Sequence, residues 1–231
     1  MEYMAGLPDK AFDLAIVDPP YGIGWDGENL CMSLGLRKDG SKRHDPSWLA
    51  KKGIQKYERK SWDNAPPKEY FDELERISKK RIIWGGNNFD LKPSSSWIVW
   101  DKKKPENWSM SDCELAWVSF GGSVKIFRFL WHGYGKESPE TRIHPTQKPV
   151  KLYEWLLRNY AKPGQRILDT HGGSMSIAIA CHNLGYDLTL CELDEGYYKA
   201  GVKRFEQHKA QGSLFIPDTP KDAYKQTDLL Y

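Results

Sequence analysis

Leu14-Ala15-Ile16-Val17-Asp18-Pro19-Pro20-Tyr21 is the stretch from which the architecture of this chain can be read. The double proline ends a short aliphatic run, because proline cannot continue a sheet ladder and holds the preceding residue extended. We therefore expect a buried parallel strand with Asp18 at its carboxyl end. Ligands of open α/β sheets bind at that edge, so Asp18 and an exposed Tyr21 ring are expected to face a ligand crevice.

An acid, a carbonyl group and an aromatic ring together suit a flat substrate that carries an amino group. The exocyclic nitrogen of adenine or cytosine is a poor nucleophile because its lone pair is delocalised into the ring. If Asp18 and the Pro19 carbonyl each accept one N–H, that lone pair becomes more available, while Tyr21 stacks on a base that has left its duplex. The alternative is a structural turn, since Asp-Pro and Pro-Pro are common in loops.

The later part of the chain predicts a nucleotide-type site. Residues 166–169 form an expected strand, Gly172 and Gly173 a turn, and residues 174–184 a helix that Gly185 ends. Small residues in such a turn let a ligand approach the backbone closely. Glu192 ends the next expected strand about 20 residues further on, where an acid that accepts ribose hydroxyls is expected.

The remaining elements follow from periodicity and breakers. The close succession of three strands between residues 97 and 129 indicates an antiparallel addition to a parallel sheet. The full set comprises helices over 65–80, 148–160, 174–184 and from 195 onward, and strands over 14–17, 81–84, 97–100, 114–118, 124–129, 166–169 and 187–192.

Taken together, these blocks resemble the β class of the DNA amino-methyltransferases, in which a D/N/S-P-P-Y/F motif precedes the cofactor motifs. The resemblance spans roughly residues 8–208 and rests on the blocks Asp18–Tyr21, His144–Pro149, Arg166–Ser174 and Leu190–Asp194. It implies an α/β fold of the Rossmann-like, S-adenosylmethionine-dependent methyltransferase type, with a mostly parallel sheet, an antiparallel addition and a permuted motif order. It implies no metal.

The resemblance also assigns site residues. The catalytic residues are Asp18, Pro19, Pro20 and Tyr21. The residues implied for the cofactor S-adenosylmethionine are Thr146, Lys148, Asp169, His171, Gly172, Gly173, Ser174 and Glu192. Lys148 is expected to pair with the carboxylate of the cofactor; the alternative is a lysine near a helix start that meets no ligand.

Two departures from the family pattern predict weaker cofactor binding. Where the family has D-P-F-x-G-S-G-T, this chain has Met175 in place of the second glycine and His171 at the aromatic position. We expect the Met175 side chain to stand where a ligand approaches, with Gly172 compensating. Family members also have a strand and a G-D turn ahead of the helix that precedes the catalytic strand, and the acid of that turn reaches the adenine of the cofactor. Either other helix ends supply this contact here, or the sequence lacks the segment that carries it.

The charge distribution predicts a nucleic-acid contact. Residues 37–60 contain nine Lys or Arg and three acids, a local net charge of +6 (nine minus three), whereas the whole chain carries +3. The predicted DNA contacts are Arg37, Lys38, Lys42, Arg43, Lys51 and Lys52. A solvated charge run is the alternative. Lys102, Lys103 and Lys104 form a second candidate for contact with the phosphate backbone.

Length and composition indicate one globular domain over residues 1–210, with recognition inserts at about 25–64 and 101–143 and a peripheral tail at 211–231. No apolar run approaches the ~20 residues of a membrane span and no signal-peptide pattern opens the chain, so a cytoplasmic protein is expected. The four cysteines form no C-x-x-C pair, which indicates reduced thiols.

The sequence therefore predicts a methyltransferase that modifies adenine N6 of a flipped base in duplex DNA. The family's DPPY form is associated mainly with adenine and its SPPY form with cytosine. An N4-cytosine enzyme, an RNA N6-adenine enzyme and a catalytically silent DNA-binding protein are the alternatives. A homodimer and a cognate restriction nuclease are further candidate partners.

Overall fold

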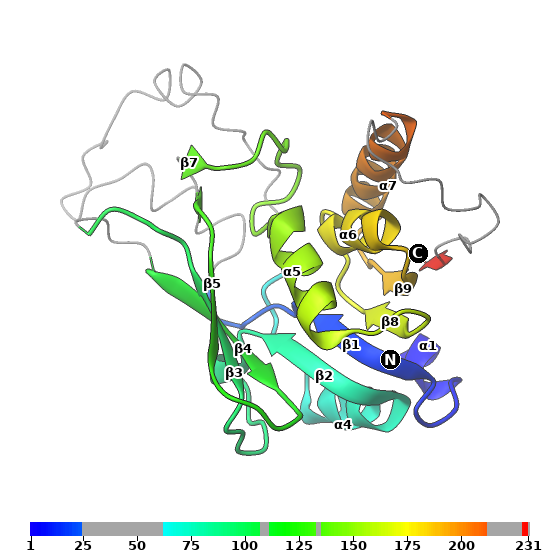
Figure 1. Cartoon of the computed structure of the whole chain (residues 1–231). Helices are drawn as coiled ribbons and strands as arrows, with labels where there is room; N and C mark the ends of the chain where they lie inside the picture. The colour runs from blue at the N-terminus through cyan, green and yellow to red at the C-terminus, as the bar shows by residue number, and fades with distance from the viewer. Residues whose placement is uncertain (25–61, 107–110, 133–134, 212–227, 231) are drawn as a thin grey trace.

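The computed structural model describes residues 1–24, 62–106, 111–132, 135–211 and 228–230. Its main strands are β1 (Phe12–Val17), β2 (Ser78–Trp84), β3 (Trp97–Asp101), β4 (Cys113–Val118), β5 (Lys125–Arg128), β8 (Arg166–Asp169), β9 (Asp187–Cys191) and β10 (Asp228–Leu230). They form one eight-stranded sheet in the order β10-β9-β8-β1-β2-β4-β3-β5 (Figure 1). A second, two-stranded sheet pairs β6 (Trp131–His132) with β7 (Gly135–Lys136).

The first strand is buried and parallel, as predicted, and it lies near the centre of the sheet. β1 pairs in parallel with β2 on one side and with β8 on the other. Its residues Leu14 and Ile16 belong to the core on one face of the sheet, and Ala15 and Val17 to the core on the other. All four are fully buried, because a central strand of an α/β sheet is covered on both faces.

Helices cover both faces of the sheet (Figure 1). α5 (Val150–Tyr160) and α6 (Ser176–Leu184) contribute side chains to one core, with α7 (Glu195–Ala210) beside them. α1 (Glu2–Ala5) and α4 (Lys68–Ile77) contribute to the other, and η1 (Gly86–Asn88) is a short 3-10 turn after β2. This is the doubly wound arrangement, and it confirms the predicted fold class.

One strand runs against the other seven. β4 pairs antiparallel with both β2 and β3, whereas β5 pairs in parallel with β3. The predicted antiparallel addition is therefore the insertion of β4 between two strands that share a direction. Because β4 is reversed, its first residues Cys113 and Glu114 lie at the edge where β2 and β3 end, and Glu114 pairs with Trp100.

Some predicted boundaries were wrong for identifiable reasons. The helix expected to reach residue 80 ends at Ile77, because the ladder between β1 and β2 already begins with Phe12 opposite Ser78. The helix expected from residue 174 begins at Ser176, because Gly173 and Met175 both adopt left-handed backbone conformations. Asp194 caps α7, accepting the N–H of Tyr197 at 2.9 Å.

The last described residues add β10 to the edge of the sheet, parallel to β9. The predicted domain limits stay predictions, since most of residues 25–64 and of the tail lie outside the described residues. Across the part of the chain that the structure describes, no helix combines the length and apolarity needed to cross a membrane.

Candidate active site

The carboxyl edge of the sheet gathers a cluster of charged side chains that are buried or half-buried. Asp18 follows β1, Glu114 is the second residue of β4, and Lys148 precedes α5 by two residues. The Lys148 Nζ lies 2.5 Å from Asp18 Oδ2 and 3.0 Å from Glu114 Oε2. Lys102, directly after β3, places its Nζ 2.5 Å from Glu114 Oε1. We call Asp18, Lys148, Glu114 and Lys102 the charge cluster.

Lys148 uses its donors inside this cluster. An ammonium has three N–H donors, and those of Lys148 meet Asp18, Glu114 and, at 3.3 Å, the hydroxyl of Tyr21. Its side chain is 3% exposed, and a buried ammonium requires such pairing. The expected pairing of Lys148 with the cofactor's carboxylate stays a prediction, and it would require the ammonium to leave one of these partners.

Tyr21 does not present the exposed ring that the sequence predicted. It is half-buried, and its hydroxyl donates to Asp18 Oδ1 at 2.9 Å. The ring lies against Gly85, where an added Cβ would stand 2.2 Å from the Tyr21 Cε1. This hydrogen bond satisfies both the Tyr21 hydroxyl and the half-buried carboxylate of Asp18, which explains why the hydroxyl points inward. Burial raises the pKa of Tyr21 well above its usual range, so it remains a neutral donor.

The two carboxylates of the charge cluster differ in basicity. Burial raises the pKa of Asp18, against the opposing attraction of Lys148. Burial acts the same way on Glu114, but Lys148 and Lys102 together bring its pKa down to about 2. Burial alone would lower the pKa of Lys148, yet Asp18 and Glu114 raise it. Asp18 is thus the stronger base of the pair, the type of separation that assigns acid–base roles in active sites.

The glycine turn between β8 and α6 forms the second part of the site. Glu192, after β9, accepts the N–H of Gly173 at 2.6 Å and that of Asp194 at 2.8 Å. A Cβ added at Gly173 would meet nothing nearer than the His144 ring at 3.9 Å, so the turn is open at this point and bordered by the His144–Pro149 segment. Thr146 is exposed there, and its Oγ1 lies 3.1 Å from His144 Nδ1.

The other predicted residues of the turn make contacts within the protein. A Cβ at Gly172 would stand 2.3 Å from Leu190 Cδ2, so this glycine is required by contact with β9 and does not compensate for Met175. Asp169 is 1% exposed and accepts the His171 N–H at 2.9 Å; burial raises its pKa to about 8. Burial lowers the pKa of His171 to about 4, and its ring packs on Tyr70.

Met175 does not stand in the path of a ligand, contrary to the sequence-based expectation. Its side chain is fully buried, because the left-handed backbone at this position, with φ of 56°, directs it into the core. Gly201 of α7 leaves the space, since a Cβ there would lie 2.8 Å from Met175 Cγ. A glycine in α7 thus accommodates the methionine that replaces a glycine in the turn.

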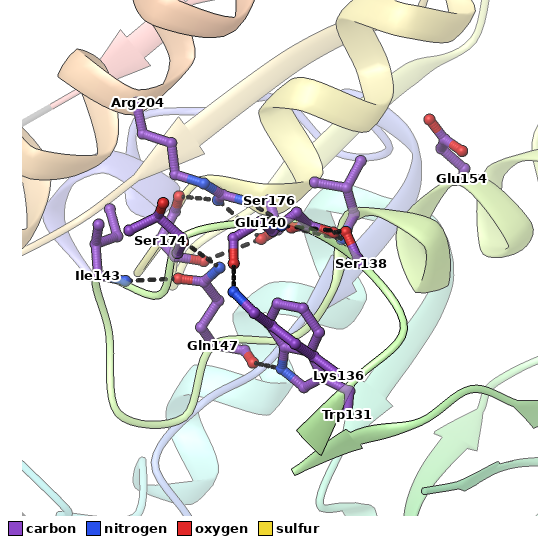
Figure 2. Close-up of polar contacts among 12 residues, drawn as sticks. Trp131, Lys136, Ser138, Glu140, Ile143, Gln147, Glu154, Ser174, Ser176 and Arg204 are labelled. Carbon is purple, nitrogen blue, oxygen red and sulfur yellow. Dashed lines mark hydrogen bonds and ion pairs between the residues drawn. The ribbon is translucent and has the colours of Figure 1, made fainter. Parts of the chain in front are cut away.

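A half-buried ion pair that was not predicted from the sequence holds the turn (Figure 2). Arg204 of α7 donates to the Ser174 carbonyl at 2.7 Å, to Ser176 Oγ at 3.0 Å and to Glu140 Oε2 at 2.7 Å. Glu140 also accepts the first N–H of α5, from Val150, at 3.2 Å. We call Glu140 and Arg204 the clamp. It ties the turn, α7 and the start of α5 together, and Ser174 is 5% exposed within it.

Gln147 fixes the loop that leads to Lys148. Its Oε1 accepts the Ile143 N–H at 2.9 Å, and its backbone carbonyl accepts the indole N–H of Trp131 at 2.6 Å (Figure 2). Its Nε2 donates to the Thr141 carbonyl at 3.2 Å. The glutamine of the His144–Pro149 block is therefore a structural residue, which positions Lys148 for its ion pairs.

The predicted DNA contacts from Arg37 to Lys52 lie outside the described residues. In the second candidate segment each lysine has an acidic partner. Lys102 pairs with Glu114 in the charge cluster, Lys103 with Glu137 at 3.0 Å and Lys104 with Asp112 at 2.6 Å. These three side chains are thus engaged within the protein, which argues against their expected contact with a phosphate backbone.

Asp18 with its two prolines, and a glycine turn with Glu192 at its edge, both lie at the carboxyl edge of a doubly wound sheet, the arrangement expected of a Rossmann-like methyltransferase. Comparison with known proteins agrees with this class. The chain belongs to the N6/N4 DNA methylase family, and its residues 23–203 match that family. "Putative methylase YubD" of Escherichia coli (strain K12) is 32% identical over 225 residues, covering 93% of this chain and 94% of the relative.

Solved structures share the fold at low identity. TTHA0409 of Thermus thermophilus is similar with a TM-score of 0.51 and 15% identity, over 100% of this chain and 96% of that one. PvuII DNA methyltransferase (cytosine-N4-specific) is similar with a TM-score of 0.52 and 14% identity, over 90% and 86% of the two chains. At these identities the likeness describes the fold alone.

Proposed function

We propose that this protein transfers a methyl group to N6 of an adenine flipped out of duplex DNA. The observation that carries the proposal is the position of Asp18, a half-buried carboxylate with a raised pKa, followed by two prolines at the carboxyl edge of the sheet. S-adenosylmethionine is the methyl donor of the family to which the chain belongs.

The residues at the glycine turn fit that donor. Gly173 leaves open space above the turn, and Glu192 offers a carboxylate at its edge for the ribose hydroxyls. Glu192 already accepts two backbone N–H groups, but each carboxylate oxygen has a second lone pair to share. When bound, S-adenosylmethionine supplies an electrophilic methyl carbon. No metal is needed for this chemistry, since the sulfonium already activates that carbon.

Asp18 and the Pro19 carbonyl would each accept one N–H of the amino group and so make its lone pair available. Tyr21 would act by orienting Asp18 through their hydrogen bond, in place of the stacking role predicted from the sequence. Adenine is favoured over cytosine by the DPPY form of the motif. Cytosine N4 presents the same amino geometry, so it is the second candidate.

The test is transfer of labelled methyl groups to three acceptors: unmethylated duplex DNA, the corresponding single-stranded DNA and single-stranded RNA. Digestion to nucleosides then identifies the product. We expect label in N6-methyladenine from DNA. Label in N4-methylcytosine would replace the base assignment, label confined to RNA would replace the substrate class, and intact DNA binding without any transfer would support a silent binding protein.

A further inference from the structure

Glu114 is a second carboxylate on the lysine that holds Asp18, and the family motifs do not account for it. The Lys148 ammonium is shielded from water, so its charge is divided between Asp18 at 2.5 Å and Glu114 at 3.0 Å. Glu114 in turn is bound from its other oxygen by Lys102. With two carboxylates and two ammonium groups, the charge cluster is neutral as a set.

The division of charge matters for methyl transfer. A carboxylate held alone by a buried ammonium is a weak base and a weak acceptor of further hydrogen bonds. When the N–C bond forms, the C–S bond breaks with its electron pair on sulfur, and the amino nitrogen carries one proton too many. Asp18 is the carboxylate placed to accept that proton, and its affinity for it depends on how much of the Lys148 charge it receives.

We propose that Glu114 is a positioning residue of this site. It shares the charge of Lys148 with Asp18 and so keeps Asp18 able to accept a proton, while Lys102 sets how strongly Glu114 competes for that charge. This inference rests on the proposed function of Asp18 in methyl transfer. Glu114 acts through Lys148 and does not itself contact the substrate amino group.

The direction of each effect follows from the groups that face Asp18. These groups are Lys148, Tyr21, Glu114, Tyr153 of α5 and Asp169 after β8. Burial raises the pKa of Asp18, Lys148 lowers it and Glu114 raises it. Glu114→Gln leaves the whole lysine charge to Asp18, so the pKa of Asp18 falls. Lys102→Gln leaves Glu114 with Lys148 as its one cluster partner, so the pKa of Asp18 rises.

The experiment measures the pH profile of single-turnover methyl transfer for wild type, Glu114→Gln and Lys102→Gln. For Glu114→Gln we expect the acidic limb to move down by about one pH unit and the plateau rate to fall roughly tenfold. For Lys102→Gln the limb moves up. Lys103→Gln is the matched control, since Lys103 pairs with Glu137 outside the cluster, and its profile stays at the wild-type position.

A second readout separates this inference from the proposed function. Carbon-13 NMR titration of the Asp18 side chain reports its pKa in the same four proteins without any turnover. Opposite displacements in Glu114→Gln and Lys102→Gln support the inference even if wild type transfers no methyl group, an outcome that would refute only the function. Displacements that are absent, or that share a direction, overturn it. If Glu114→Gln does not fold, Lys102→Gln is the test: a raised pKa of Asp18 supports the inference, and an unchanged or lowered pKa overturns it.

Discussion

Asp18 and Asp169 lie at the ends of neighbouring strands, yet their surroundings give them different properties. Asp18 has a lysine, a tyrosine hydroxyl and partial access to solvent, with its side chain 16% exposed. Asp169 is enclosed, and within the described part of the chain it accepts the backbone N–H of His171. Burial makes this carboxylate costly to ionise, and the nearby charges of Asp18 and Glu192 add to the effect against the opposing charge of Lys148, so the pKa of Asp169 is raised to about 8.

The raised pKa of Asp169 predicts a stability effect with a definite sign. The folded protein holds this proton up to a pH of about 8, whereas the unfolded chain releases it near 3.8, so stability falls as pH rises between these values. Asp169→Asn keeps an oxygen that can accept the His171 N–H but has no charge. We expect the variant to be more stable than wild type at pH 8 by about 1–3 kcal/mol.

Denaturant unfolding at pH 5 and pH 8 measures this difference. The gain in the free energy of unfolding should be larger at pH 8 than at pH 5, where wild-type Asp169 is protonated. An equal gain at both values would show that Asp169 titrates normally in the folded protein.

At the scale of elements, the glycine turn depends on α7 more than its own sequence suggests. Arg204 of α7 holds the Ser174 carbonyl, and Gly201 of the same helix leaves room for Met175. The clamp adds Glu140 and the start of α5 to this arrangement. The turn is therefore shaped by contacts from helices on either side of it in the chain.

The pairing of Met175 with Gly201 predicts a coupling between two substitutions. Gly201→Ala should destabilise the protein by about 1–3 kcal/mol, because its Cβ would enter the volume of Met175. In a Met175→Ala background the same change should cost much less, since the obstructing side chain is gone. Thermal or denaturant unfolding of the four proteins in this double-mutant cycle gives the coupling energy.

Gly121→Ala is the matched control for that cycle, because a Cβ at Gly121 meets nothing within 4 Å and its change in stability should be small. If Gly201→Ala costs the same in both backgrounds, the two residues are independent, and α7 does not explain how the chain tolerates a methionine in its turn.

At the scale of the whole molecule, the reversed strand β4 separates what the sequence could predict from what it could not. The buried strand before Asp18, the glycine turn and the acid Glu192 follow from local patterns, and the structure places each at the expected edge. Glu114 follows from no local pattern. It reaches this edge because β4 enters the sheet antiparallel, and strand order is a property of the complete fold.

Side-chain orientation is the second feature that could not be predicted from the sequence. The inward hydroxyl of Tyr21 and the buried Met175 depend on partners far along the chain, namely Gly85 and Gly201. The clamp likewise joins Glu140 to Arg204 across the sequence. One local signal was available: an antiparallel strand was expected between residues 97 and 129, and an acid at its start could have been assigned to the carboxyl edge.

The charge distribution of the whole chain predicts salt-dependent DNA binding through residues 37–60. Replacing Lys51 and Lys52 by Gln should weaken binding about equally for all sequences and reduce the slope of log affinity against log salt by about 2. Fluorescence anisotropy over a salt series measures the slope. Lys79→Gln, Lys79 being paired with Asp13 at 2.8 Å, is a control of similar chemistry. An unchanged slope in the double variant would favour a solvated charge run.

The most direct test of the proposed role of Asp18 compares wild type with Asp18→Asn in methyl transfer to unmethylated duplex DNA, with cofactor binding measured by calorimetry on the same samples. Asparagine retains an acceptor oxygen but cannot take up the proton. We predict N6-methyladenine from wild type, a loss of at least about 100-fold in the variant and cofactor affinity within about threefold of wild type. Transfer by Asp18→Asn at the wild-type rate would contradict the assignment of Asp18 as the proton acceptor.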